Sequence, residues 1–198
     1  IAALVQALSR DGARVIGFDV LFSESEDDGR LALIGELERA LDTSRITDPQ
    51  LRGILQKGRV AADQDRLLAS ALEHSQAPVV LGYFFHMSEQ GVGFRIDRSE
   101  IERRLESIAD SRYPMVYKDP QAKAEPFIKA YAPQANLPVF TEKAASSGYF
   151  SVTSDDDGVV RWMPLVIQGG EDFFPPLALL GAWHYLGKPQ LAVRVGRY

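Results

Sequence analysis

The sequence predicts an α/β fold, with a mixed, mostly parallel sheet that carries helices on both faces. Two continuous apolar runs, residues 15–18 and 79–85, are typical of buried parallel strands. About 60 residues separate the runs, which suits a right-handed βαβ crossover that holds more than one helix. A single domain is expected over residues 1–198, because 45% hydrophobic residues suffice for a proper core.

Composition and charge exclude several classes of function. The net charge of −5 argues against a nucleic-acid partner, because nucleic-acid-binding proteins cluster Lys and Arg. The chain has no cysteine, so disulfides, thiolate catalysis and cysteine-ligated zinc are excluded. No apolar run reaches the roughly 18 residues that a bilayer requires, and we therefore expect no transmembrane span within the chain.

Helical signals fill the segments before and between the two runs. The first helix is expected to end at Gly12, because apolar residues recur at helical spacing up to that point. Further helices are expected at residues 29–41 and 49–56. Asp63 is typical of an N-cap, and Asp65 lies in the first turn of the helix that Asp63 begins. This helix is expected to bury Leu67, Leu68, Ala71 and Leu72.

Residues 88–135 are polar and are expected to form a peripheral inserted lobe. The lobe holds one amphipathic helix, around Ile101, Leu105 and Ile108. It also carries aromatic side chains of the kind that protein interfaces use. These aromatic residues are Phe94, Tyr113, Tyr117, Phe127 and Tyr131.

An antiparallel hairpin is expected near residues 148–167, with Asp157 and Gly158 in its tight turn. Arg161 follows on the second strand, where it is a solvated charge, the partner of a nearby carboxylate or a ligand contact. The three consecutive acids 155–157 lack the alternating spacing of a calcium loop, so a plain turn is favoured. Beyond the hairpin we expect a loop at residues 169–172, a helix from Pro176 to Leu186 and a strand at 191–195.

Asp19 ends the first strand, at the edge where open α/β sheets bind their ligands. Phosphatase-like enzymes place a nucleophilic Asp there and usually a second acid two residues later, where this chain has Leu21. A cap for a loop or helix and a ligand contact are the other interpretations of Asp19. The acidic run at residues 23–28 follows directly; it is a solvated loop or it rims the same edge.

Motifs for catalysis and for cofactors are missing. The chain contains no phosphate-binding loop, no dinucleotide fingerprint after its first strand and no nucleophile elbow. The three histidines are scattered along the chain, so a metal site is not expected. We therefore assign no catalytic residue, no metal and no cofactor.

An ordered set of short motifs runs through the chain. In order they are Gly17–Phe22, Asp65–Leu72, Val79–Leu81, Gly148–Phe150, Asp156–Arg161, Pro164–Leu165 and Pro176–Leu179. Their order and spacing resemble the second type of CHASE domain (cyclases/histidine kinases associated sensory extracellular) over nearly the whole chain. Two positions depart from the family: Ser151 and Val152 stand where an Asn is frequent, and Pro176 replaces the Ser of Pro-Ser-Leu.

The resemblance implies the extracytoplasmic sensor of a bacterial membrane receptor, located in the periplasm or outside the cell. Such domains usually sit between an N-terminal transmembrane helix and a C-terminal group of such helices. The cytoplasmic output is a histidine kinase, an adenylate or diguanylate cyclase, or a Ser/Thr kinase. Both ends of this chain fall inside predicted elements, so we expect a domain of a longer protein.

The leading hypothesis is therefore a signal-input domain that has no chemistry of its own and binds an unknown small-molecule or ionic signal. Its candidate ligand-binding residues are Asp19, Phe22, Asp65, Asp157 and Arg161. An alternative is an interaction module that forms a homodimer or binds a partner through residues 88–135. A remote alternative is a hydrolase that depends on Asp19.

Overall fold

The computed structural model describes residues 1–26, 29–93, 95–121, 127–152, 155 and 157–196. The predictions made for Phe94, for Asp156 and for the end of the acidic run at 27–28 lie outside these residues. The helices are α1 (Ala2–Arg10), α2 (Arg30–Thr43), α3 (Pro49–Ala62), α4 (Gln64–Glu73), α5 (Glu89–Val92), α6 (Arg98–Glu106), α7 (Pro138–Thr141) and α8 (Leu177–Tyr185), with a 3-10 turn η1 (Ala109–Ser111). The strands are β1 (Ile16–Phe18), β2 (Val79–His86), β3 (Val116–Lys118), β4 (Ile128–Ala130), β5 (Ala132–Gln134), β6 (Ser146–Tyr149), β7 (Ile167–Gly169), β8 (Asp172–Phe174) and β9 (Val193–Val195).

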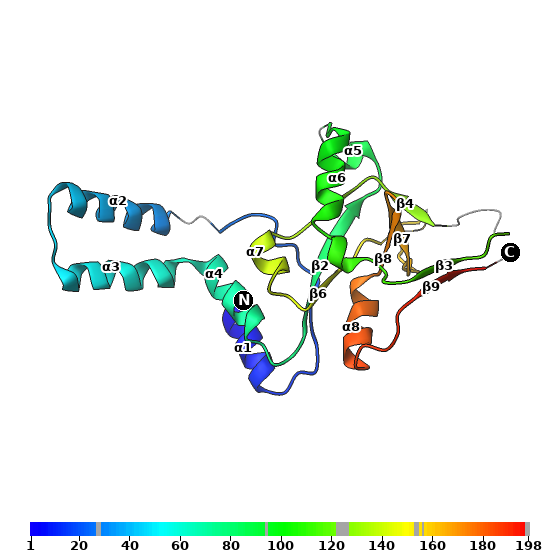
Figure 1. Ribbon diagram of the computed structural model, residues 1–198, viewed down its shortest axis with the longest axis horizontal. Helices are drawn as coiled ribbons and strands as arrows, with labels where there is room; N and C mark the ends of the chain where they lie inside the picture. The colour runs from blue at the N-terminus through cyan, green and yellow to red at the C-terminus, as the bar shows by residue number, and fades with distance from the viewer. Residues whose placement is uncertain (27–28, 94, 122–126, 153–154, 156, 197–198) are drawn as a thin grey trace.

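Strand β2 is the centre of the main sheet (Figure 1). It pairs in parallel with β1 and with β6, and antiparallel with β5. Two smaller sheets hold the parallel pair β3–β9 and the order β4–β7–β8, in which only β7–β8 is antiparallel. The predicted α/β fold with a mixed, mostly parallel sheet is therefore confirmed, and so is the parallel pairing of the first two strands.

Helices cover both faces of the main sheet, as the sequence predicted. On one face, Val79 and Leu81 of β2 pack with Val5 of α1, Leu72 of α4 and Phe140 of α7. On the other face α8 lies against β6, β2 and β1. It comes so close that a Cβ on Gly148 would stand 2.8 Å from the backbone of Leu177. The absence of a side chain at Gly148 is thus what lets α8 seat on the sheet.

The segment expected to be a peripheral lobe contributes to the core. Strand β5 from this segment pairs with β2, and Ile108 is buried against Tyr83 and Phe85. Tyr113 is 8% exposed and packs in a further cluster with Phe173 and β9. Of the four aromatic residues of this segment that the structure describes, only Tyr117 is classed as exposed.

The antiparallel hairpin expected near residues 148–167 is not found there. Its first strand is β6, which pairs with β2 instead, and residues 157–166 contain no strand. The turn is present, since Gly158 has a φ of 79° and its N–H donates to Asp155 O at 2.8 Å. Pairing of β6 with β2 is more stable than the expected hairpin, because an isolated two-stranded ribbon is marginal in water, whereas pairing with β2 buries Tyr149 completely. The hairpin of this region is β7–β8, across the predicted loop at 169–172.

Helices α2 and α3 form an arm that projects from the rest of the molecule (Figure 1). We call residues 30–62 the helical arm. No residue of α2 is buried, and Ala62 is the only buried residue of α3. The arm differs from prediction mainly in length, because α3 continues to Ala62 and not to residue 56. Helix α4 follows the arm. Leu67, which was predicted to be buried, is 37% exposed, and Ala69 of the same helix is buried in the core.

Candidate functional site

The chain that leaves β1 is clamped at Phe22. The Phe22 ring packs edge-on against Phe18 and Phe140, with centroid distances of 5.9 and 5.5 Å. The Phe22 N–H donates to Asn136 Oδ1 at 2.7 Å, and the amide of Asn136 donates to Gly82 O at 2.8 Å. Asn136 is only 5% exposed, so one buried amide holds the end of β1 and the middle of β2 in fixed relation.

The loop that follows is tied to the first turn of α4. The carboxylate of Asp65 accepts a hydrogen bond from the Ser25 hydroxyl and another from the Glu26 N–H at 3.2 Å. Asp63 caps the same helix by accepting from the Arg66 N–H at 3.0 Å, as its position in the sequence predicted. Asp65 therefore arranges the loop around the helix start, where the helix dipole favours negative charge.

These contacts enclose a cavity of about 140 Å³, which we call the acidic cavity. Apolar side chains of Phe22, Leu68 and Phe140 line one part of it, while the first residues of α1 form another wall. The three acidic residues Glu24, Glu26 and Asp65 complete the lining together with Gln64. The site thus combines apolar contacts with acidic groups at the edge of the sheet where the sequence predicted a ligand.

Two of the five predicted site residues, Phe22 and Asp65, line the acidic cavity. Asp19 lies at the same end of β1 but is exposed, and it makes no hydrogen bond or ion pair among the described residues. The structure therefore shows no helix or loop capped by Asp19. No partner that would activate it for catalysis is present in the described part of the chain.

Asp157 and Arg161 do not line that cavity. Their side chains are joined by a bidentate contact at 2.7 and 2.9 Å, and Arg161 also donates to Asp155 at 2.7 Å. The hydrogen bond from Arg161 lowers the pKa of Asp157 below its usual value. The side chains are about half exposed, so this pair orders an exposed turn. Of the alternatives for Arg161, the structure shows the ion pair.

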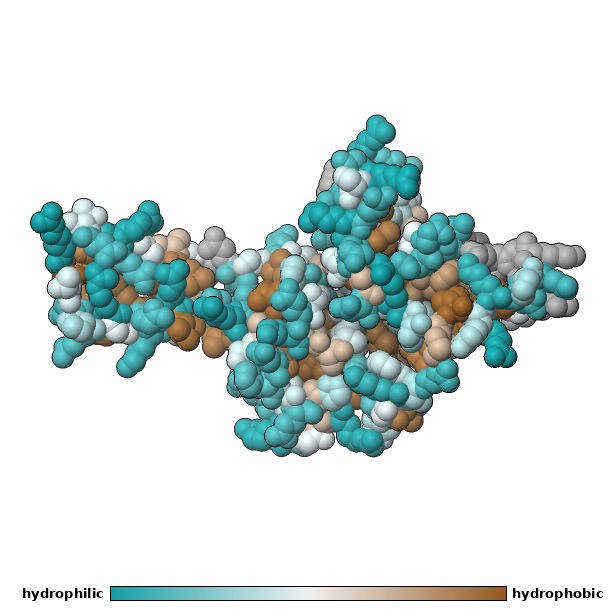
Figure 2. All heavy atoms as spheres, viewed as in Figure 1, coloured by the Kyte–Doolittle hydropathy of each residue, from teal (hydrophilic) through white to brown (hydrophobic). Residues whose placement is uncertain are grey.

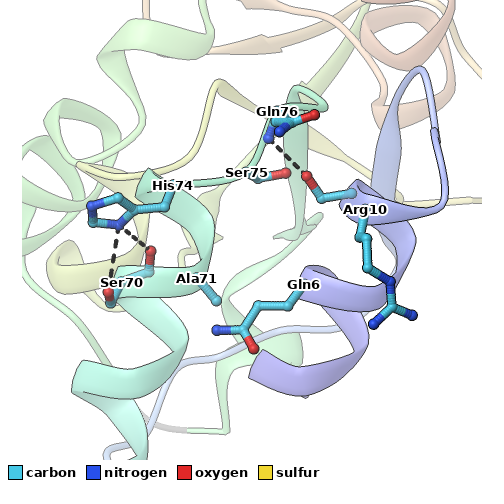
Figure 3. Close-up of a pocket in the computed structure, with 8 residues that line it drawn as sticks. Gln6, Arg10, Ser70, Ala71, His74, Ser75 and Gln76 are labelled. Carbon is cyan, nitrogen blue, oxygen red and sulfur yellow. Dashed lines mark hydrogen bonds between the residues drawn. The ribbon is translucent and has the colours of Figure 1, made fainter.

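A larger cavity, of about 490 Å³, lies between the C-terminal ends of α1 and α4 (Figure 3). Its polar groups already bond to one another. Ser9 Oγ accepts from the Gln76 N–H at 2.8 Å, and His74 Nδ1 lies 2.8 Å from Ser70 O. None of the predicted site residues lines it. Volume alone therefore does not favour it over the acidic cavity, which touches the start of α1.

The match that decides the family covers almost the whole chain. A family model described as the CHASE2 domain matches residues 1–196. This chain belongs to the CHASE2 domain family. CHASE2 is an extracellular sensory domain family of receptors linked to cyclases and kinases, and its role is sensory and not catalytic. No curated protein and no solved structure matched the chain.

Two buried side-chain contacts of this CHASE2 domain were not predicted from the sequence. Asn136 was not singled out, because its partners lie 114 and 54 residues away and leave no local pattern. Ser151, one of the departures from the family, accepts from the Phe85 N–H at 2.7 Å inside the protein. It thereby satisfies a donor of the central strand.

The described residues contain neither a cluster of metal ligands nor a membrane-spanning helix. No three His, Asp or Glu side chains among them are grouped so that they could hold a metal ion. None of the described helices is long and apolar enough to cross a membrane.

Proposed function

We propose that this CHASE2 domain is the extracytoplasmic signal-input domain of a bacterial transmembrane receptor that controls a cytoplasmic kinase or nucleotide cyclase. We further propose that its signal is a small cation that binds in the acidic cavity. The observation that carries the proposal is the lining of that cavity, in which three carboxylates meet apolar side chains and the first residues of α1.

The size and charge of the cavity define the ligand class. Typical pockets for organic ligands measure about 300–1,000 Å³, so 140 Å³ admits only a small group. Glu24, Glu26 and Asp65 present oxygen acceptors, whereas Phe22 and Phe140 offer apolar surface. A short alkylammonium ion satisfies both features. A metal ion is less favoured, because these three described acids are not grouped so that they could hold one. Anionic signals are disfavoured because three carboxylates would repel them.

The link from ligand to receptor would run through α1. Helix α1 packs beside α4; both begin at the acidic cavity and both end at the larger polar one. A ligand that draws the Glu24 loop toward α4 changes the wall against which α1 begins. If one arrangement of α1 binds the ligand better, binding shifts the population toward that arrangement.

Thermal unfolding of the chain in the presence of inorganic cations and short alkylamines tests the proposal. A ligand at 100 times its dissociation constant should stabilise the fold by about 2.7 kcal/mol, which is roughly 5–10 °C in a domain of this size. Glu24→Gln should abolish that shift and leave the unliganded melting temperature unchanged, because Glu24 makes no hydrogen bond or ion pair among the described residues. Glu171→Gln is the matched control, because Glu171 is exposed at the turn between β7 and β8, away from both the acidic cavity and the helical arm.

Three results would overturn the cation site. The first is a full screen in which no cation changes the melting temperature. The second is a ligand whose shift persists in Glu24→Gln. The third is an equal loss of the shift in Glu171→Gln, which would indicate non-specific charge screening.

A further inference from the structure

The helical arm leaves an apolar surface uncovered. Each of its helices has 14 residues, a length that is marginal for a helix without tertiary cover. Yet Leu33 is 57% exposed, Leu37 46% and Ile54 65%. Figure 2 shows hydrophobic atoms at the surface of this arm among hydrophilic side chains. The helices pack on one another, and α3 also contacts α4, so cover for this surface has to come from outside the described chain.

The uncovered residues lie on one face of the arm. The two helices meet along a seam where a Cβ on Gly58 would stand 3.7 Å from Ile34. Leu33 and Leu37 follow each other after one helical turn and lie about 100° and about 60° around α2 from Ile34, on the same side of it. Ile54 lies about 40° around α3 from Gly58, in the same rotational sense. Because the helices are antiparallel, the two stripes fall on the same side and form one apolar face.

The two helices of the arm differ in charge. Helix α2 carries the acids Glu36, Glu38 and Asp42 beside two bases, Arg30 and Arg39, whereas α3 carries only the bases Arg52, Lys57 and Arg59. Two opposite pairs are used within the arm, Arg52 with Asp42 at 2.6 Å and Arg59 with Glu38 at 2.7 Å. Glu36 and Lys57 make no ion pair or hydrogen bond among the described residues. The α2 edge of the arm therefore offers the acid Glu36 and the α3 edge offers the base Lys57, and these two charges complement each other.

We propose that this face binds a second copy of the chain, so that two arms form a four-helix bundle. The ion pairs within the arm place Glu36 and Lys57 at about the same height on their helices. A two-fold axis parallel to the helices lays α2 of one copy on α3 of the other. It brings Glu36 beside Lys57 of the second copy, on both sides of the bundle. A two-fold axis perpendicular to the helices would instead place Glu36 near Glu36 of the second copy, and these like charges would repel each other.

This interface differs from the one that residues 88–135 suggested, because most of the described aromatic residues of that segment are at least partly buried. It is also independent of the acidic cavity, which contains no residue of the arm. A lipid surface or an unrelated protein are the competing occupants of the face. Neither accounts for the paired acidic and basic edges, since a lipid surface would select one sign of charge.

Sedimentation equilibrium of the 198-residue chain measures the dimer directly. We expect a reversible dimer whose dissociation constant rises at least about tenfold in Ile54→Ser and in Leu37→Ser. Leu186→Ser is the matched control, because Leu186 is 69% exposed but lies at the end of α8. It should leave the dissociation constant unchanged. Circular dichroism and melting of the diluted monomers should show that every variant remains folded.

Charge reversal tests the arrangement of the two copies. Lys57→Glu and Glu36→Lys should each weaken the dimer by roughly threefold to tenfold, because each places like charges together. The double variant Glu36→Lys with Lys57→Glu restores opposite charges and should restore the wild-type dissociation constant. With the opposite axis, Lys57 would face its own copy. Lys57→Glu would then exchange one like-charged pair for another, and the dissociation constant would stay about the same.

Several results would overturn the proposal. One is a chain that stays monomeric at the highest concentration at which it is soluble. Another is a dimer that Ile54→Ser and Leu186→Ser weaken equally. A monomer that binds vesicles of phosphatidylcholine and phosphatidylglycerol, and loses that binding in Ile54→Ser, would assign the face to lipid. Single charge reversals without effect would reject the paired edges.

Discussion

Strand β2 and the helical arm are both rich in apolar residues, but only β2 is covered. Six of the eight residues of β2 are buried, and Val80, Leu81 and Tyr83 have no exposed surface. The 14-residue helix α2 has no buried residue at all. The cover of β2 comes from β1, β5, β6 and α8, segments that are distant in the sequence. Burial in this protein thus depends on what the topology brings to a segment, and not on how hydrophobic the segment is.

The largest expected difference between the two regions comes from cutting back one apolar side chain in each. Phe140→Ala should lower the free energy of unfolding by about 3–5 kcal/mol, because Phe140 is 1% exposed and its loss leaves a cavity. Leu37→Ala should change it by less than about 0.5 kcal/mol in the dilute monomer, because Leu37 lies on the surface. Urea unfolding at low protein concentration measures both. Equal losses of unfolding free energy in the two variants would show that the arm is packed against the rest of the molecule in solution.

A glycine in each region gives effects of opposite sign. Gly148→Ala should destabilise by about 1–3 kcal/mol, because its Cβ would lie 2.8 Å from the backbone of Leu177 and α8 would have to move. Gly53→Ala in α3 should stabilise by about 0.5–1 kcal/mol, because nothing lies within 4 Å and alanine favours the helix. Melting temperatures that move in the same direction for both variants would contradict the comparison.

The smallest expected effect is a pH dependence of the folding stability that arises from His184, outside the helical arm. Burial, and then the charge of Lys188, lower the pKa of His184 below its ordinary 6.5. The folded protein therefore resists protonation, while the unfolded chain gains a proton near its ordinary pKa. Stability should accordingly be complete above about pH 6.5 and fall as the pH drops below it.

Two histidine variants separate the contribution of His184 to the pH dependence from that of other groups. His184 Nε2 lies 2.9 Å from Ser146 Oγ, a contact that His184→Gln can preserve in part. Urea midpoints between about pH 5 and 8 should lose most of their dependence in His184→Gln. They should keep it in His74→Gln, since His74 is exposed at the end of α4. A slope that survives in His184→Gln would assign the effect to other groups.

Sequence reasoning succeeded where the signal was local. The cap at Asp63, the stop at Gly12 and the two buried runs each depend on neighbouring residues, and each is found in the structure. The short strands β3, β4, β7 and β8 were missed because three residues carry no periodicity. Their pairing comes from distant segments, as with β3 and β9. The expected hairpin failed for the same reason, since a distant strand outcompeted a near one.

The candidate site divides in a similar way. Phe22 and Asp65 were predicted because one follows the first strand and the other opens a helix at the same edge of the sheet. The turn acids and Arg161 belong to a separate turn. There they form the ion pair that the sequence analysis named as one interpretation of Arg161. The ligand-binding role of all five residues stays a prediction for the thermal screen.

The amide of Asn136 also has a consequence for how the fold is completed in time. The hydrogen bonds of Phe22 and of Gly82 to this side chain cannot form until Asn136 has been synthesised. The bond between Phe22 and Asn136 closes a loop of 114 residues. Contacts of such long range form slowly, because the entropy of loop closure has to be overcome first. A nascent chain that ends before residue 136 also lacks β6, so one edge of β2 is open to pairing with other molecules. The riskiest moment for aggregation therefore comes after β2 has been synthesised and before Asn136 and β6 have been added, because the sheet is then incomplete.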